Sequence, residues 1–389
     1  MRGRTLWFVV TPVYWPAPGG AANYTKLLAE ALAGDGTEVV IATEAYPGTA
    51  KRERVPIGLG GVVIDRLFPM RAGRAVLDWR SYAAYAWQNV LMLSLPGRLA
   101  RALRETGADR AVVLVHSSFF YKRSLMPSIL QRMRDQLPDA IRLVIDVRDP
   151  LFDQSRMPPF ARFDAAIGCS RMISDRLRVL LPDGMEVVHL PIPFEVGTPP
   201  GDDEVASVLA EYGLDHIPYV LNPNGIHEAK RYPEMLDAIR ELRRMPGHEN
   251  AVLVTFGRSR DWKARDDAAV AEGVLKYIGI VPNSTAMALA KKAIATLILS
   301  PIEGMPRSAL ETLALGKPIV APPIAEFLEH IPASVVQSTD PGDVARHIVR
   351  VSEQPSGERY PIEVHSTASL VAAYRALEPS SFSRAKETD

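Results

Sequence analysis

The sequence predicts an α/β protein of two domains, each built on a parallel sheet. Short runs of β-branched and leucine residues alternate with amphipathic helical stretches along the chain, a pattern typical of doubly wound sheets. The 389 residues are enough for two domains with sizeable cores. Near the middle, Pro191–Glu204 is rich in proline, glycine and acidic residues, which indicates a linker. We therefore expect domains at 1–195 and 204–364.

The first domain opens with a strand, a glycine loop and a helix. Leu6–Thr11 reads as a buried strand, and a helical pattern runs over Ala21–Ala33. Between them, Gly19 and Gly20 allow a ligand to approach the backbone at the helix start. Further strands are predicted at Glu38–Thr43, Arg110–His116, Ile141–Val147, Asp164–Ser170 and Glu186–Leu190.

Polar residues follow two of these strands where each ends. His116 closes one strand, and Arg148 and Asp149 follow another. Open α/β sheets bind ligands at the carboxyl ends of their strands. His116 is therefore either a ligand contact or a structural residue, and Arg148 and Asp149 either pair with each other or contact a substrate.

The stretch Lys51–Arg80 is less regular, and Trp79–Glu105 is helical in pattern with an interruption at Pro96-Gly97. Aromatic and basic residues mix in Trp79–Glu105. That composition suits either a membrane-surface helix or a core helix with a basic exposed face. The first half of the chain is also basic and the second half acidic, which fits an acceptor on an anionic membrane surface.

The second domain repeats the alternation. Its strands and helices are predicted at Tyr219–Asn222, Tyr232–Arg243, Ala251–Phe256, Asp266–Val274, Tyr277–Ile280, Ser284–Lys292, Ile294–Leu299, Ile319–Ala321 and Asp343–Ser352. A last helix at Ser366–Ala376 lies in the segment 365–389, which we expect to cross back to the first domain and end in a frayed tail.

Two glutamates flank a predicted helix start in the second domain. Glu303 lies in a loop, Pro306 occupies the first helical position, Glu311 lies inside the helix, and Gly316 follows its end. Helix starts suit phosphate groups, and an acid one turn further along suits a sugar's hydroxyl pair. On spacing alone, a surface loop acid and a solvated helix acid are the favoured interpretation.

Composition excludes several classes. The 45 basic and 45 acidic residues balance, which argues against a nucleic-acid binder. The single cysteine, Cys169, excludes an internal disulfide and fits a reducing, cytoplasmic compartment. The first apolar run is too short for a signal peptide, and no apolar segment is long enough to span a bilayer. No D-x-D motif occurs, and Asp202-Asp203 and Asp266-Asp267 read as surface charge; we expect no metal and no cofactor.

At this point the residues resemble the retaining GT-B glycosyltransferases of family 4. The strongest match is SPIEGMPRSALETLALGKPIVA at Ser300–Ala321, which is similar to the family's E-x7-E element. The Gly19-Gly20 loop, the strand ending in His116, IDVRDP at Ile145–Pro150 and AAIGCSRMISDRL support it. The resemblance implies two Rossmann-like domains facing across a cleft and a nucleotide-sugar donor.

The resemblance also implies roles for individual residues. Glu311 would bind the ribose, and Glu303, with Gly304, Met305, Pro306 and Arg307, would hold the donor sugar and diphosphate. Further donor contacts are implied at Gly19, Gly20, Gly225 and Gly257. The catalytic set would be Glu303, Lys230, His116 and Arg231, with Arg148 and Asp149 on the acceptor side.

The match departs from the family in the segment NGIHEAKRYPEML. Lys230 falls in the family's lysine place, whereas Ile226 stands where arginine is expected; Arg231 or His227 would have to replace it. Met305 and Arg307 also differ from the usual residues. Two alternatives follow: a catalytically silent sugar-nucleotide-binding partner of another transferase, and a nucleotide-sugar 2-epimerase. The acceptor is open, and a peripheral position at the inner face of the membrane is an expectation.

Overall fold

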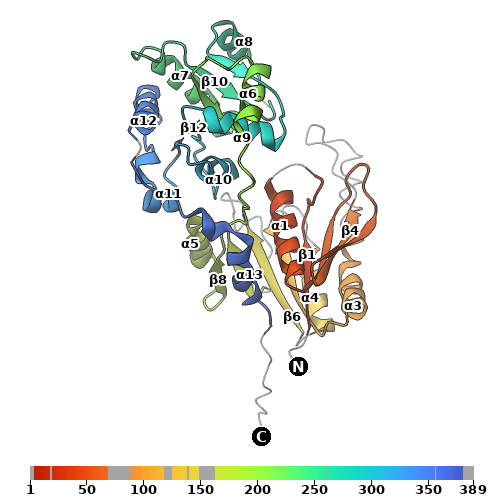
Figure 1. The fold of residues 1–389 in the computed structure, drawn as a ribbon. Coiled ribbons are helices and arrows are strands. Elements are labelled where there is room, and N and C mark those ends of the chain that lie inside the picture. The colour runs from red at the N-terminus through yellow and green to blue at the C-terminus, as the bar shows by residue number, and fades with distance from the viewer. Residues whose placement is uncertain are drawn as a thin grey trace. The chain divides into compact units, whose positions relative to one another are not determined.

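The computed structural model describes residues 4–17, 20–68, 87, 90–117, 125–137, 140–148, 163–259, 261–354 and 356–379. The chain forms two compact units (Figure 1). Unit 1 joins Met1–Phe194 to Val364–Asp389, and unit 2 comprises Glu195–Glu363. Each unit contains a sheet of largely parallel strands with helices packed on it, so the predicted α/β class with doubly wound sheets is confirmed.

The sheet of unit 1 has the strand order β3-β4-β2-β1-β5-β6-β7-β8. All described neighbours pair in parallel except β3 and β4, which form an antiparallel hairpin at one edge. The strands are β1 Thr5–Val10, β2 Glu38–Glu44, β3 Arg52–Ile57, β4 Gly60–Phe68, β5 Arg110–His116, β6 Ile141–Val147, β7 Ala165–Gly168 and β8 Glu186–His189.

Alternating side chains of the central strand β1 divide the core of unit 1 into two layers. Leu6 and Phe8 belong to one buried cluster, and Trp7 and Val9 belong to the other, because successive strand residues point to opposite faces. The packed helices are α1 Gly20–Gly34, α3 Leu95–Thr106, α4 Met126–Gln136, α5 Arg171–Leu180 and α13 Thr367–Arg375.

The C-terminal helix α13 packs within unit 1. Leu370, Tyr374 and Leu377 lie in the same buried cluster as Trp7. The hydroxyl groups of Tyr374 and Tyr24 on α1 are 2.5 Å apart, and the indole N–H of Trp7 donates to Glu378 over 3.2 Å. Segments more than 300 residues apart in sequence are therefore joined in one core, as the blue and red ribbons of Figure 1 show.

Unit 2 contains a five-stranded sheet in the order β11-β10-β9-β12-β13, paired in parallel throughout its described strands. The strands are β9 Tyr219–Asn222, β10 Val252–Thr255, β11 Leu275–Tyr277, β12 Thr296–Leu297 and β13 Ile319–Val320. The α-helices are α6 Asp202–Glu211, α7 Tyr232–Leu242, α8 Ala264–Ala271, α9 Asn283–Lys292, α10 Arg307–Ala314, α11 Ala325–His330 and α12 Pro341–Glu353.

Three interpretations of the sequence change. The stretch taken as irregular contains the β3–β4 hairpin. Pro96 lies in the first turn of α3 rather than interrupting a longer helix, because a proline N–H is not needed there. Asp266 is not surface charge: it is buried, and its carboxylate accepts the Lys263 amide at the start of α8 over 2.7 Å.

The membrane-surface interpretation rests on a stretch whose first part, 79–86, lies outside the described residues. In its described part, Arg98 pairs with Asp65 and Arg101 with Glu105. None of the helices in the described ranges is long and apolar enough to cross a membrane. Cys169 is buried directly after β7.

Candidate functional site

Two glycines bring the loops after β9 and β10 into direct contact. Gly225 has a φ of +70° and Gly257 a φ of +114°, conformations that side-chain-bearing residues rarely adopt. A Cβ added to Gly225 would lie 2.3 Å from the carbonyl oxygen of Arg258. The Asn222 side chain donates to the Gly225 carbonyl over 3.0 Å, which holds the turn against the end of its own strand. Both positions therefore require glycine for packing, whatever else they do.

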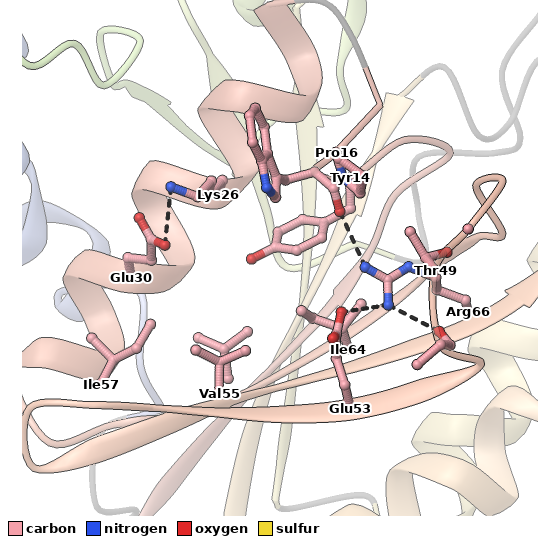
Figure 2. Close-up of a pocket in the computed structure, with 14 residues that line it drawn as sticks. Tyr14, Pro16, Lys26, Glu30, Thr49, Glu53, Val55, Ile57, Ile64 and Arg66 are labelled. Atoms are coloured by element: carbon pink, nitrogen blue, oxygen red, sulfur yellow. Dashed lines mark hydrogen bonds and ion pairs between the residues drawn. The ribbon is translucent and has the colours of Figure 1, made fainter.

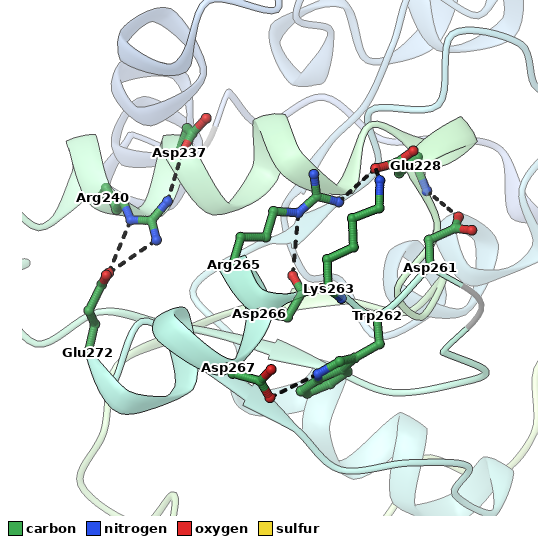
Figure 3. Close-up of polar contacts among 10 residues, drawn as sticks. All are labelled: Glu228, Asp237, Arg240, Asp261, Trp262, Lys263, Arg265, Asp266, Asp267 and Glu272. Carbon is green, nitrogen blue, oxygen red and sulfur yellow. Dashed lines mark hydrogen bonds and ion pairs between the residues drawn. The ribbon is translucent and has the colours of Figure 1, made fainter.

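Ion pairs hold the first residue of the short 3₁₀ helix η4, Glu228–Lys230, in place (Figure 3). The Glu228 carboxylate pairs with Lys263 and Arg265, and the Glu228 amide donates to Asp261 over 2.9 Å. Hydrogen bonds from Lys263 and Arg265 lower the pKa of Glu228. These contacts bind η4 to the first turn of α8 and the residues before it, and so they restrict where the side chain of Lys230, the last residue of η4, can lie.

Lys230 reaches the loop before α10. Its Nζ lies 2.5 Å from the Glu303 carboxylate, with 33% of the lysine side chain and 15% of the glutamate side chain exposed. The next residue, Arg231, adopts the left-handed conformation with a φ of 56°. Backbone strain of this kind in a non-glycine residue often marks functional segments. Lys230 and Glu303, 73 positions apart, are thus brought together as one charged pair.

Helix α10 begins at Arg307, with Pro306 as its N-cap residue. The predicted helix start is therefore one residue early, within the usual uncertainty of helix ends. The loop that precedes α10 buries Gly304, Met305 and Pro306. The amide groups in the first turn of any α-helix have no acceptor within the helix. The start of α10, four residues after Glu303, therefore carries the partial positive charge of a helix N-terminus.

Glu311 lies one turn inside α10. Its carboxylate accepts from the Arg307 guanidinium over 3.1 Å, and 17% of its side chain is exposed. Burial raises the pKa of Glu311, with Arg307 opposing that shift. A half-buried carboxylate with one cationic partner retains acceptor capacity for a further donor.

The residues near the family's arginine place have clear structural roles. Ile226 is fully buried in the core of unit 2 and bridges to Ser259. His227 Nδ1 lies 3.0 Å from Asp261 and accepts the Ala229 amide over 3.3 Å. In contrast, no hydrogen bond or ion pair joins the Arg231 side chain to another described residue. Of the two replacements considered for the missing arginine, Arg231 is the more available.

The predicted residues of unit 1 lie at the carboxyl edge of its sheet. Gly20 is the exposed first residue of α1, and His116 is the last residue of β5, with 8% of its surface exposed. Gly19 and Asp149 lie outside the described residues. The two described candidates of unit 1 therefore lie at the start of a helix and at the end of a strand.

Arg148 forms a buried pair that the sequence patterns did not predict. Its Nε donates to the Asp146 carboxylate over 2.7 Å, and its guanidinium lies over the ring of Tyr24. Burial lowers the pKa of Arg148 to about 10 and raises that of Asp146. Asp146 is the sixth residue of β6, and an acid inside an apolar strand is the signal that could have identified it. Whether Arg148 also contacts an acceptor stays a prediction.

A group of three or more His, Cys, Asp or Glu side chains placed to hold a metal ion does not occur in the part of the chain that the structure describes. The expectation of a metal-free reaction stays a prediction. The site therefore consists of the Lys230–Glu303 pair, the Gly225–Gly257 contact, and the first turns of α10 with Glu311.

Part of the chain matches a known family model. Residues 218–354, about a third of the chain and most of unit 2, match the family model described as glycosyl transferases group 1. No match was found among curated proteins.

The whole chain is similar in structure to several sugar-phosphate synthases. A sucrose-phosphate synthase from Thermosynechococcus elongatus aligns with a TM-score of 0.64 at 16% identity, covering 96% of each chain. A trehalose-6-phosphate protein from E. coli aligns with a TM-score of 0.60 at 14% identity, covering 96% of each chain. An α,α-trehalose-phosphate synthase from Burkholderia xenovorans aligns with a TM-score of 0.59 at 16% identity, covering 96% of this chain and 100% of that one.

These similarities establish the fold as GT-B, as the resemblance implied. The family model gives unit 2 a group 1 glycosyltransferase domain, and the solved structures show the fold of the whole chain. The group 1 domain contains Lys230, Glu303 and Glu311 within its matched residues.

Proposed function

We propose that the protein is a retaining glycosyltransferase that moves a sugar from a nucleoside-diphosphate sugar to an acceptor hydroxyl without a metal ion. The observation that carries this proposal is the Lys230–Glu303 pair beside the start of α10. The donor site lies in unit 2, whose group 1 domain supplies every residue of the set.

The diphosphate is assigned to the Lys230 ammonium and the start of α10. Among the described residues, the Lys230 ammonium donates to the Glu303 carboxylate, and an ammonium has three donors. Helix starts favour anions through their free amides and partial positive charge. Gly225 and Gly257 have no side chains that would screen the backbone of the two adjoining loops.

The sugar and ribose hydroxyls are assigned to the two carboxylates. Glu303, oriented by Lys230, would accept from the donor sugar. Glu311, held by Arg307, would accept from the ribose. Because each carboxylate has a defined cationic partner, neither is an unrestrained surface acid.

The chemistry follows from charge development. When the bond from the sugar's anomeric carbon to the phosphate oxygen breaks, negative charge grows on the leaving diphosphate. Cationic and N–H groups directed at that charge stabilise the transition state more than the ground state. The acceptor oxygen would attack from the same face, and its proton would pass to the departing phosphate. Arg231, whose guanidinium has no partner among the described residues, would be the second cation.

Two similar proteins support a nucleotide sugar as donor. The E. coli protein was solved bound with UDP-2-fluoro glucose, and the Burkholderia xenovorans structure is a UDP-forming synthase in complex with glucose-6-phosphate. We extend only the donor class to this chain. Cytoplasmic action at an anionic membrane surface remains part of the hypothesis, and sedimentation with anionic vesicles at low salt tests it.

Ligand binding and donor hydrolysis test the proposal. A thermal-shift panel of UDP-, GDP- and ADP-glucose should show a raised melting temperature with one base, since a ligand of the folded state stabilises it. Glu311→Ala should remove that shift, and Glu329→Ala, an exposed acid outside the site, should keep it. A panel without any shift, or an unchanged shift in Glu311→Ala, would contradict the donor site.

The buried Ile226 favours one alternative, a protein that binds the nucleotide sugar without turning it over. In that case the thermal shift would persist, but no nucleotide would be released with any acceptor offered. A 2-epimerase would instead release nucleotide or a C2-epimeric sugar without an acceptor.

A further inference from the structure

A cavity of about 430 Å³ lies in unit 1, and none of the residues assigned so far lines it. It lies between α1 and the β3–β4 hairpin (Figure 2). Its volume is within the range of small-molecule sites in proteins. The segments after β1 and β2 and the C-terminal part of β4 contribute Tyr14, Trp15, Thr49 and Arg66. It therefore reaches the carboxyl edge of the sheet, where open α/β sheets bind ligands.

The floor of the cavity is one face of the hairpin. Val55 and Ile57 of β3 and Val62 and Ile64 of β4 all line it. Alternate strand residues share a face, and Val55 pairs with Val62 in the hairpin register. Four aliphatic side chains thus form a continuous apolar surface. They offer no hydrogen bond, so a ligand lying on them needs an apolar body.

The charged groups at the walls are already neutralised. Lys26 lies 3.2 Å from Glu30 on the next turn of α1, and Arg66 lies 2.5 Å from Glu53. Arg66 also donates to the carbonyl groups of Ala50 and Trp15. The two cations and two anions balance, and Arg66 is committed to the protein. The cavity therefore favours a neutral ligand over a phosphate or sulfate.

One buried polar group is directed into this space. Tyr14 is 6% exposed, and its hydroxyl points into the cavity (Figure 2). None of the described residues hydrogen-bonds this hydroxyl. Burial and the carboxylates of Glu30 and Glu53 raise the pKa of Tyr14, so the hydroxyl stays protonated and can donate. The hydroxyl is reached from the cavity, and a ligand oxygen lying on the apolar floor can accept its hydrogen bond.

The rim adds an aromatic surface. Trp15 is 50% exposed, and Lys26 lies 5.5 Å from the centre of its ring. A half-exposed indole beside an apolar floor can stack on a flat ring.

We propose that this cavity binds the apolar ring of a neutral hydroxylated acceptor, an aryl or alicyclic alcohol, with Tyr14 donating a hydrogen bond to an oxygen of the ligand. The designation of the ligand as acceptor rests on the proposed function. A free monosaccharide is disfavoured, because its hydroxyl groups would lie against four aliphatic side chains without partners.

Binding of 2-naphthol to the full-length protein tests the proposal, with 2-naphthalenesulfonate and glucose as the anionic and sugar comparisons. Calorimetry should show binding of 2-naphthol and at least tenfold weaker binding of the other two. Tyr14→Phe keeps the ring and removes the donor, so the Kd of 2-naphthol should rise about fivefold. Val55→Glu should weaken binding more than tenfold, because it places a charge on the floor.

Val179→Glu is the matched control for Val55→Glu. Val179 is 84% exposed on α5, at the opposite edge of the sheet, and its variant should bind 2-naphthol as the wild type does. Equal binding of all three compounds, or a Kd unchanged in both Tyr14→Phe and Val55→Glu, would overturn the inference. Tyr14→Phe and Val55→Glu that retain the wild-type melting temperature exclude misfolding as the cause.

The donor panel separates this inference from the proposed function. If a nucleotide sugar binds and Glu311→Ala removes that binding while 2-naphthol does not bind, the cavity inference alone fails. If 2-naphthol binds in the cavity but no nucleotide sugar binds, the proposed function and the acceptor designation fail. If both bind, 2-naphthol should increase nucleotide release by the wild type and not by Val55→Glu.

Discussion

Each unit contains a cationic side chain that pairs with a glutamate, but the two pairs differ in what they leave available for a ligand. Lys230 in unit 2 and Arg66 in unit 1 each lie 2.5 Å from a glutamate. The Lys230 side chain is 33% exposed, whereas that of Arg66 is 3% exposed. Arg66 also donates to two carbonyl groups. Arg66 therefore acts as a structural link between loops, and Lys230 keeps donors available for a ligand.

The two sites also differ in what they can recognise. The unit 2 site combines an ammonium group, a helix start and two glycines whose backbones are in contact. These features suit a negatively charged sugar donor. The unit 1 cavity combines neutralised ion pairs with an aliphatic floor, which suits an uncharged ring. The presence of an ion pair thus does not by itself define a phosphate site. What matters is how exposed the cation is and how many hydrogen-bond donors it has left.

The largest expected effect is on turnover. Lys230→Met should reduce turnover of the nucleotide sugar roughly 10²- to 10³-fold, because one electrostatic donor to the leaving group is lost. Lys292→Met, an exposed lysine on α9, should be unaffected. Steady-state nucleotide release with the preferred sugar donor measures both. Equal activity of Lys230→Met and wild type would remove the contrast between the two cations.

The matching change in unit 1 should affect stability instead. Arg66→Met leaves Glu53 and two carbonyl groups without their donor, so the free energy of unfolding should fall by about 2–3 kcal/mol. Arg54→Met, on the same hairpin but 54% exposed at its side chain, should lower it by less than about 1 kcal/mol. Urea denaturation of the three proteins gives these values. A similar loss in both variants would contradict the structural role of Arg66.

The pH dependence of nucleotide binding sharpens the assignment of Glu311. Burial raises the pKa of Glu311 above its ordinary value, so its protonation begins at a higher pH than that of an exposed glutamate. Since ribose hydroxyls would donate to the carboxylate, nucleotide affinity should fall several-fold as the pH falls through the raised pKa. Glu311→Gln should bind weakly and without that pH dependence. Parallel profiles for both proteins, measured by calorimetry between pH 7.5 and about 5, would count against the assignment.

The same shift has an opposite effect on the unliganded protein. The folded state binds the Glu311 proton more tightly than the unfolded chain, so this group's destabilising contribution is complete above the folded pKa and decreases as the pH falls towards about 4.3. Glu311→Gln should remove that part of the pH dependence of the free energy of unfolding.

The smallest expected effect concerns the strained residue beside Lys230. Arg231→Gly should raise the free energy of unfolding by about 1 kcal/mol, because glycine adopts the left-handed conformation without steric strain. Arg231→Ala keeps the strain and should not stabilise the protein. Both should lower turnover if the guanidinium faces the donor. A stabilised Arg231→Gly variant with full turnover would show that Arg231 has no part in the reaction.

Local patterns predicted much of the fold. The alternation of apolar runs with helical stretches, the loop of Pro191–Glu204 and the Pro306 to Gly316 helix correspond to elements of the structure within a few residues. Parallel strands are buried on both faces, so they appear in the sequence as continuous apolar runs. The β3–β4 hairpin was missed, although Glu53, Val55 and Ile57 occupy every second position before a Gly58–Gly60 turn. None of the six residues of its edge strand β3 is buried, and so its hydrophobic signal is weak.

The candidate site was predicted only in part. Glu303, Glu311 and Lys230 were found through a family pattern, because their spacing alone fits ordinary surface acids and bases. The pairing of Lys230 with Glu303 could not be read from a separation of 73 residues. Asp146 was overlooked although it is an acid inside an apolar strand. The cavity residues Tyr14 and Arg66 were not identified, since nothing local distinguishes their buried side chains from exposed ones.

The sequence by itself determined the class of fold, the order of its elements and which glutamates lie at a helix start, because these depend on periodicity and on residues with strong local preferences. Only the tertiary structure decided which charges pair, that the Tyr14 hydroxyl has no partner among the described residues, and which side chains of the C-terminal helix enter the core of unit 1. Those outcomes depend on contacts between segments distant in sequence, and burial alters the free energy of each charge according to its partners.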